Sequence, residues 1–175
     1  MDETQGRAAL GREPLITEAA RALIGRVTET YLGEISLRDA RRYAIAAGDL
    51  NPLYFDEEFA RASAYGGLIV PPNMLTAVRA WGAGATEPEL AIDGIPDLPE
   101  EKLPIALTRR MAGGQELEYH QPVRPGDRIT RRGHIVSLDE RDGRSGKFVI
   151  ALREDHYYNE RDELLVTCRE TVIIR

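Results

Sequence analysis

A short polar loop carries the residues of this sequence that are best suited to chemistry. Asp49 supplies a carboxylate, Asn51 a side-chain amide and Tyr54 a phenol, within six consecutive positions. A carboxylate can take a proton from water, and a phenol can donate a hydrogen bond to that water or to a carbonyl oxygen. The loop is therefore a candidate site for general acid–base catalysis. Asp, Asn and Pro are also common turn residues, so a simple helix-exit turn is the alternative interpretation.

Helices are predicted on both sides of this loop. Ser36 can cap a helix that ends at Gly48, because apolar residues recur on one face of this segment and glycine is the usual residue after a helix C-terminus. Asp56 can cap a second, short helix, with Phe59 and Ala64 among the residues that face inward. We therefore expect both ends of the loop to be fixed by helix caps.

A third helix is predicted over residues 73–81, directly after two prolines. Proline is tolerated in the first turn of a helix because the N–H that it lacks would have no partner there. The segment has one charged residue and an apolar stripe, so we expect it to be the most buried helix. Residues 82–112 are rich in Gly and Pro and show no periodicity, which predicts a long flap or a subunit contact.

The rest of the chain is predicted to be an N-terminal arm and short helix at 1–24 and a domain at 25–175. Strand patterns lie at 26–32, 115–123, 128–138, 147–158 and 164–174. Because the helices come first and most strands follow, the class is α+β. An antiparallel sheet wrapped around one long buried helix is the hot-dog fold, and we predict that fold.

Composition narrows the classes of partner. The 175 residues suit one domain, and the formal net charge of -6 argues against nucleic acid or an anionic membrane as partner. Cys168 is the only cysteine, so an internal disulfide is excluded, and its apolar surroundings predict a buried thiol. The N-terminus lacks the apolar core of a secretory signal, and no run is long enough to span a bilayer, so a cytoplasmic location is expected.

Two groups of polar residues invite a functional interpretation. Glu116, Glu118 and His120 share one face of a predicted strand, but a solvated face paired with arginines is favoured over a metal site. We expect neither a metal nor a cofactor. Basic residues are frequent in the second half, where they either balance carboxylates or contact phosphates of a ligand. They are Arg109, Arg110, Arg124, Arg128, Arg131, Arg132, Arg144 and Lys147.

The loop closely resembles a family signature. Residues 48–54 read Gly-Asp-Leu-Asn-Pro-Leu-Tyr, and MaoC-like, (R)-specific enoyl-CoA hydratases carry Gly-Asp-x-Asn-Pro-Leu-His. The segments at 113–119 and 124–127 are similar to the FAS1-like dehydratase subgroup, and the resemblance runs from residue 24 to 175. It implies a hot-dog fold, a homodimer or a heteromer with a second MaoC-like subunit, and an acyl-CoA or acyl-carrier thioester as ligand.

The catalytic histidine of this family falls on Tyr54. In the family, aspartate and histidine together activate a water for addition to the enoyl double bond, and the aspartate matches Asp49. A free tyrosine has a pKa of about 10, against about 6.5 for histidine, so a phenol is protonated at neutral pH and is no unassisted base. The sequence therefore keeps the frame of the site and lacks its imidazole. His134 or His156 could substitute for it if the fold brought either one near Tyr54, but their spacing in the sequence does not indicate this.

The resemblance also implies a set of binding residues. A backbone N–H at the start of the buried helix holds the thioester oxygen in the family, which points to Asn73 or Met74, or to Gly67 in the preceding loop. Asn51 is expected to hold the loop through bonds from its side chain to the backbone.

Several functions stay open at this point. The first is an impaired hydratase or dehydratase subunit, completed by a second subunit that carries the histidine. The second is an autonomous homodimeric hydratase in which Asp49 is the base and Tyr54 its helper. The third is a non-catalytic module that binds acyl thioesters or supports assembly. A hot-dog thioesterase, with a lone carboxylate that activates water, is a further alternative.

Overall fold

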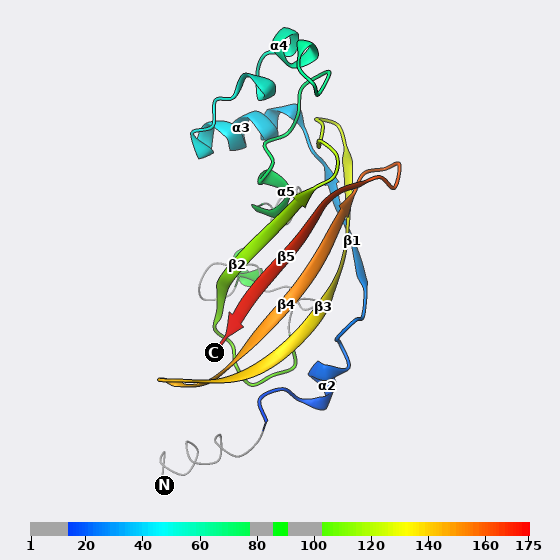
Figure 1. Cartoon of the computed structure of the whole chain (residues 1–175). Coiled ribbons are helices and arrows are strands. Elements are labelled where there is room, and N and C mark those ends of the chain that lie inside the picture. Colours follow the sequence, from blue (N-terminus) through cyan, green and yellow to red (C-terminus); the bar gives the residue numbers. More distant parts are fainter. Residues whose placement is uncertain (1–13, 78–85, 91–102) are drawn as a thin grey trace.

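One antiparallel sheet organises the molecule. The computed structural model describes residues 14–77, 86–90 and 103–175. In that part of the chain, five strands pair in the order β1-β3-β4-β5-β2 (Figure 1). They are β1 (Thr28–Glu34), β2 (Arg110–Tyr119), β3 (Arg128–Gly143), β4 (Gly146–Tyr158) and β5 (Leu164–Ile174). β3, β4 and β5 are long neighbours in the centre, and β1 and β2 form the two edges.

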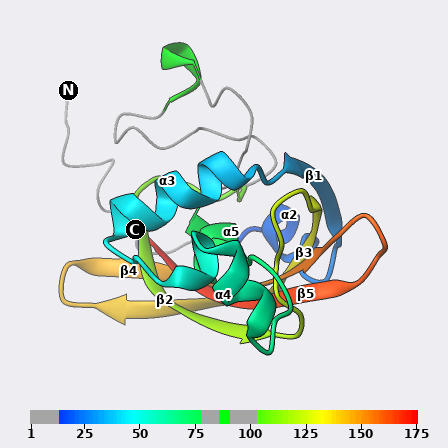
Figure 2. The same ribbon diagram turned by 90° about the horizontal axis from the view of Figure 1, so that it is seen from above.

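Short helices gather mainly at one end of this sheet. They are α2 (Glu18–Arg21), α3 (Leu37–Ala47), α4 (Glu57–Ala62) and α5 (Met74–Ala77), with 3-10 turns η1 (Pro52–Tyr54) and η2 (Glu87–Glu89). α3 and α4 lie beyond the end of the sheet where β2 finishes, and α2 lies near the opposite end (Figure 1). Figure 2 shows α3 and α5 on the same side of the sheet. This arrangement fixes the loop between α3 and α4 above one end of the covered sheet face.

The covered face of the sheet has two apolar zones. In the first, Met74 and Leu75 of α5 pack with Ala40 of α3 against sheet residues such as Val166 and Tyr157. In the second, residues around α2 pack against the far ends of the same strands; this zone includes Leu15, Ile16, Ala20, Leu138, Val149, Ala151 and Ile174. Burial of these side chains supplies the main driving force for folding.

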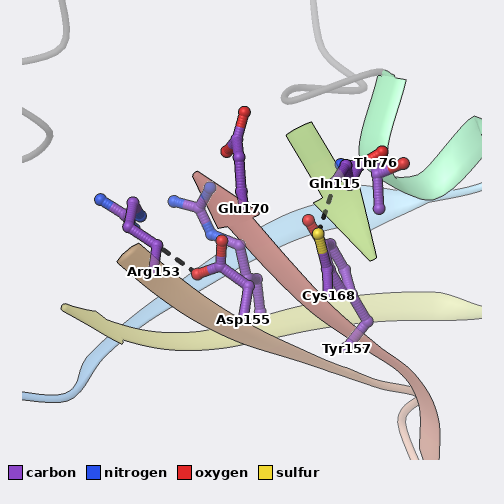
Figure 3. Close-up of a pocket in the computed structure, with 8 residues that line it drawn as sticks. Thr76, Gln115, Arg153, Asp155, Tyr157, Cys168 and Glu170 are labelled. Carbon is purple, nitrogen blue, oxygen red and sulfur yellow. Dashed lines mark hydrogen bonds and ion pairs between the residues drawn. The ribbon is translucent and has the colours of Figure 1, made fainter. Parts of the chain in front are cut away.

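A polar cavity separates the two apolar zones. It has room for about one water, near 10 Å³, and lies where strand residues meet Thr76 (Figure 3). Arg153 and Asp155 form an ion pair there, with 3.5 Å between Nη2 and Oδ1, and Glu170 lies on the neighbouring strand. Gly133 is a close-packing point, because a Cβ there would overlap Oδ1 of Asp155. These charged side chains, of which Asp155 is buried and Arg153 and Glu170 are partly buried, keep the middle of the sheet face from being uniformly apolar.

Several predicted boundaries hold and others need correction. The strand at 164–174 and the caps at Ser36, Gly48 and Asp56 are confirmed. The short helix predicted within residues 1–24 covers Glu18–Arg21, and the first strand is Thr28–Glu34 instead of 26–32. The inward orientation expected of Phe59 was wrong: half of its surface is exposed, because α4 buries only Ala60. Ala64 is exposed as well.

β2 is the largest correction. It begins at Arg110 and ends at Tyr119, whereas the pattern predicted 115–123, so residues 110–112, which were predicted to lie in the flap, belong to this strand. Gly113 and Gly114 come before the predicted start of the strand at residue 115, but they lie inside the observed strand. Gly114 has a φ of 143° at a register shift against β5, and a Cβ at Gly113 would come within 2.9 Å of the Thr171 side chain. The glycines are therefore a bulge and a close contact.

Parts of two predictions fall outside the described residues. Of the helix predicted over 73–81, the structure describes α5 and places Met74 and Leu75 in the core. Of the flap, residues 82–85 and 91–102 lie outside that description. Among the helices that are described, none is both long and apolar enough to cross a membrane.

Candidate functional site

The polar loop is built from two helix ends and a chain of side-chain caps. Gly48 ends α3 in the left-handed conformation, with a φ of 70°, which turns the chain toward Asp49. Asp49 Oδ1 then accepts a hydrogen bond from the N–H of Asn51 at 3.2 Å. Asn51 Oδ1 accepts one from the N–H of Leu53 at 3.1 Å and so caps η1. The bond from the Asn51 side chain to the backbone, expected from the sequence, is present.

Tyr54 is turned onto the aspartate. Its hydroxyl donates to Asp49 Oδ2 at 3.2 Å, and only 4% of the residue is exposed, in a cluster with Ala44 and Ile69. Burial, followed by the negative charge and the hydrogen bond of Asp49, raises the pKa of Tyr54 to about 12. The phenol is therefore protonated at neutral pH, and in this geometry it is a hydrogen-bond donor and no base. Asp49 itself is exposed to solvent.

Arg41 braces the loop from the side of α3. Its Nη2 donates to the carbonyl oxygen of Phe55 at 2.9 Å, and its Nε donates to that of Tyr54 at 3.3 Å. These carbonyls end η1, so the guanidinium fixes the turn that carries Tyr54. Sequence reasoning missed this role, because nothing in the pattern distinguishes Arg41 from the arginines beside it on the same helix.

Three backbone N–H groups at the start of α5 and in the loop before it were candidates for binding a thioester oxygen. The N–H of Met74 donates to the carbonyl oxygen of Pro71 at 3.0 Å, so this candidate is already used. The N–H groups of Asn73 and Gly67 have no acceptor among the described residues. Tyr119, which the sequence did not single out, donates from its hydroxyl to Asn73 Oδ1 at 2.9 Å. Burial raises the pKa of Tyr119, so this phenol also stays a donor.

Arg124 covers the glycine loop before α5. Its Nη2 donates to the carbonyl oxygen of Tyr65 at 2.5 Å, and a Cβ at Gly67 would lie 3.2 Å from its Nη1. Asp127 holds the backbone of Arg124, since its Oδ2 accepts the Arg124 N–H at 2.7 Å. A positive charge therefore lies against Gly67, and a side chain at this position would require the guanidinium to shift by a few tenths of an ångström.

The other polar candidates lie apart from this loop. None of the three histidines, all of which the structure describes, forms a hydrogen bond or ion pair with Asp49 or Tyr54. His156 lies 3.5 Å from Glu154, and His120 lies 2.9 Å from the Thr167 hydroxyl. Glu116, Glu118 and His120 form no metal-binding group in the described part of the chain. Glu116 instead pairs in register with Arg169.

Comparison with known proteins adds to this geometry. A family model described as the FAS1-like dehydratase domain region matches residues 22–168. This chain belongs to the FAS1-like dehydratase family. Its fold is the hot-dog fold of MaoC-like dehydratases, as the sequence predicted.

Relatives of the FAS1-like dehydratase chain include proteins of similar length and longer ones. A UPF0336 protein of Streptomyces griseus is 30% identical over 89% of this chain and 94% of its own. A probable enoyl-CoA hydratase alpha subunit of Thermomonospora curvata is 32% identical over 74% of this chain and 41% of its own. Among solved structures, the ChsH1–ChsH2 complex of Mycobacterium tuberculosis matches with a TM-score of 0.72 and 20% identity, over 90% of this chain and 89% of that one.

Proposed function

We propose that this FAS1-like dehydratase chain is a subunit of an enoyl-thioester hydratase, or 3-hydroxyacyl-thioester dehydratase, whose acid–base histidine comes from a second MaoC-like subunit. The observation that carries the proposal is the bond between Tyr54 and Asp49. In place of an imidazole that can accept a proton near pH 7, the loop holds a phenol whose pKa is raised to about 12.

Reversible hydration needs a group that removes a proton from water and returns one to the substrate carbon. A general acid–base group works best when its pKa lies near the working pH. Tyr54 is far from that range, and its hydroxyl occupies one oxygen of Asp49, while the N–H of Asn51 occupies the other. Asp49 therefore lacks a partner that could share the proton.

The groups that would bind the thioester are present in this chain. The open N–H groups of Asn73 and Gly67 support contact with a thioester oxygen, and the guanidinium of Arg124 lies beside Gly67. Hydrogen-bond donors and a nearby positive charge stabilise the negative charge that develops on such an oxygen. Met74 is dropped from this set, because its N–H already bonds to Pro71.

Three observations support a second subunit. The T. curvata relative is named an alpha subunit, and the ChsH1–ChsH2 neighbour is a complex of two different chains. β2 is also an edge strand whose residues are mostly exposed, and the unpaired backbone of such a strand is suited to pairing with a second sheet. A partner that continues the sheet there would form one dimer from two hot-dog domains.

The test compares the chain alone with a reconstituted pair. The purified chain should give no turnover of crotonyl-CoA or longer enoyl-CoAs, while the pair with a histidine-bearing MaoC-like subunit should be active. In the pair, Asp49→Asn in this chain should leave turnover unchanged, and substitution of the partner's motif histidine should abolish it. Robust turnover by the chain alone, lost in Asp49→Asn, would contradict the proposal.

An autonomous hydratase is the second candidate function, and the hydrogen bond between Tyr54 and Asp49 also supports it. Asp49 is exposed, so water can reach it, and Tyr54 is placed to donate a hydrogen bond. If the chain alone is active, Tyr54→Phe should then lower kcat/KM by roughly tenfold, the size expected for one charge-assisted hydrogen bond. An unchanged rate in Tyr54→Phe would remove Tyr54 from the mechanism. Binding of coenzyme A esters without turnover in any pair would favour a pure binding module.

A further inference from the structure

A large groove lies at the end of the sheet away from Asp49 and Tyr54. Its volume is about 630 Å³, within the range of small-molecule sites. It is formed where the start of β2, the end of β5 and the β3–β4 hairpin come together. Leu107, Met111, Phe148 and Ile173 supply apolar surface, so the groove can hold an apolar body.

The same groove carries a concentration of positive charge. Arg109, Arg144, Lys147 and Arg175 all line it. Lys147 is bonded to Glu140, but the three arginines make no ion pair among the residues that the structure describes. All three are exposed. In a chain with a formal net charge of -6, unpaired cations around an apolar surface favour an anionic head group on an apolar ligand.

The groove is separate from the polar loop of the same chain. Backbone bonds of 3.0 and 2.9 Å join Arg109 to Arg175 at one end of the β2–β5 pair. Tyr119, at the other end of β2, contacts Asn73 at the start of α5. β2 rises by about 3.3 Å per residue, so its two ends are roughly 30 Å apart. Figure 1 shows the chain terminus at β5 and the α3–α4 group at opposite ends of the sheet.

We propose that this groove is a second binding site, for a small organic anion that combines an apolar body with a carboxylate or phosphate head. The apolar body lies on Phe148 and Ile173, and the head is bound by Arg144 and Arg175. Arginine is suited to this role because its planar guanidinium can bind a carboxylate or a phosphate through two parallel hydrogen bonds. The site contains no residue of the Asp49 loop, so the tests of this proposal and of the hydratase proposal have separate outcomes.

Isothermal titration with four probes tests the proposal on the full chain. Octanoate and octyl phosphate should bind, while octanol, which lacks the charge, and acetate, which lacks the apolar body, should bind at least tenfold more weakly. The ratio of octanoate to octyl phosphate affinity tells which head the site prefers. Added salt should weaken both, because the contacts with the head are electrostatic.

Matched variants locate the binding. Arg144→Ala combined with Arg175→Ala should lower octanoate affinity by roughly tenfold or more, as expected for lost bonds to a charged group. Arg61→Ala removes an exposed arginine of α4, at the other end of the molecule, and should change nothing. Circular dichroism confirms that each variant is folded. Octanol binding equal to that of octanoate, no binding of either anion, or an equal loss in Arg61→Ala would overturn the proposal.

Discussion

At Tyr54, one change of residue alters what the whole loop can do. Histidine and tyrosine are both planar and both form hydrogen bonds, but only an imidazole can exchange a proton readily near pH 7. Tyr54 is buried, and its hydroxyl points at a carboxylate, so both influences favour the protonated phenol. The exposed Asp49 keeps a polar, water-accessible surface beside it.

This environment should be visible in a pH titration of the tyrosines. Tyr54 should ionise at about 12, and Tyr54→Phe should therefore reduce the tyrosinate absorbance that appears near this pH by the contribution of one tyrosine, while Tyr119, whose pKa burial also raises, still contributes at high pH. Tyr31→Phe, at a tyrosine that is 63% exposed, is the matched control and should leave the absorbance change near this pH in place. If the absorbance change near pH 12 is as large in Tyr54→Phe as in the native chain, the Tyr54 hydroxyl is not held as described.

The same shift links Tyr54 to stability in alkali. Its pKa is about 12 when folded and about 10 when unfolded, so the folded state favours the protonated phenol. This contribution is complete below about pH 10 and is lost as the pH rises toward about 12, and it amounts to at most roughly 2–3 kcal/mol. The free energy of unfolding, measured with urea across this window, should fall less steeply for Tyr54→Phe than for the native chain. Equal slopes would contradict the assignment.

At the scale of elements, the loop depends on how α3 ends. Gly48 adopts a left-handed conformation with open space around its Cα, so only backbone strain opposes a side chain there. Gly48→Ala should reduce the free energy of unfolding by about 1 kcal/mol, and Gly48→Asn should cost less, since asparagine tolerates this conformation better. Urea denaturation distinguishes the two. Equal losses in both variants would mean that a factor other than backbone conformation dominates.

Arg41 gives a second prediction at this scale. Arg41→Ala removes two hydrogen bonds to the carbonyls that end η1 and should destabilise the chain by about 1–2 kcal/mol. Arg42→Ala is the control, because Arg42 is exposed and has no side-chain hydrogen bond or ion pair within the described residues. If the two variants unfold at the same urea concentration, the hydrogen bonds of Arg41 contribute nothing measurable to the free energy of unfolding.

At the scale of the whole molecule, Cys168 reports on the integrity of the sheet. Its thiol is 2% exposed, on a central part of β5, and Sγ lies 3.3 Å from Gln115 Nε2 of β2. Buried thiols react only when the structure opens. Labelling with a thiol reagent in increasing urea should therefore follow the unfolding curve measured by circular dichroism. Rapid labelling in the absence of urea would show that β2 separates from β5 in the folded chain.

The sequence by itself determined the local features of this protein. The caps at Ser36, Gly48 and Asp56, the bounds of β5 and the order of helices before strands follow from side-chain chemistry within a few residues. The signature around Asp49 also pointed to the family that the comparison with known proteins then established. These features were predictable because each one depends on neighbours in the chain.

Only the tertiary structure decided which residues from separate segments of the chain contact each other. It places the carbonyls of η1 on Arg41, the Tyr119 hydroxyl on Asn73 and the guanidinium of Arg124 over Gly67. It also shows Gly113 inside β2, although the strand was predicted to begin at residue 115. Strand register and helix packing set these contacts, and they depend on residues tens of positions apart, which local patterns do not encode. The physical reason is that burial and hydrogen bonding are satisfied over the whole sheet at once. Tyr54 is buried against Ala44 and Ile69, with its hydroxyl on Asp49, only in that arrangement, and this burial keeps the phenol protonated.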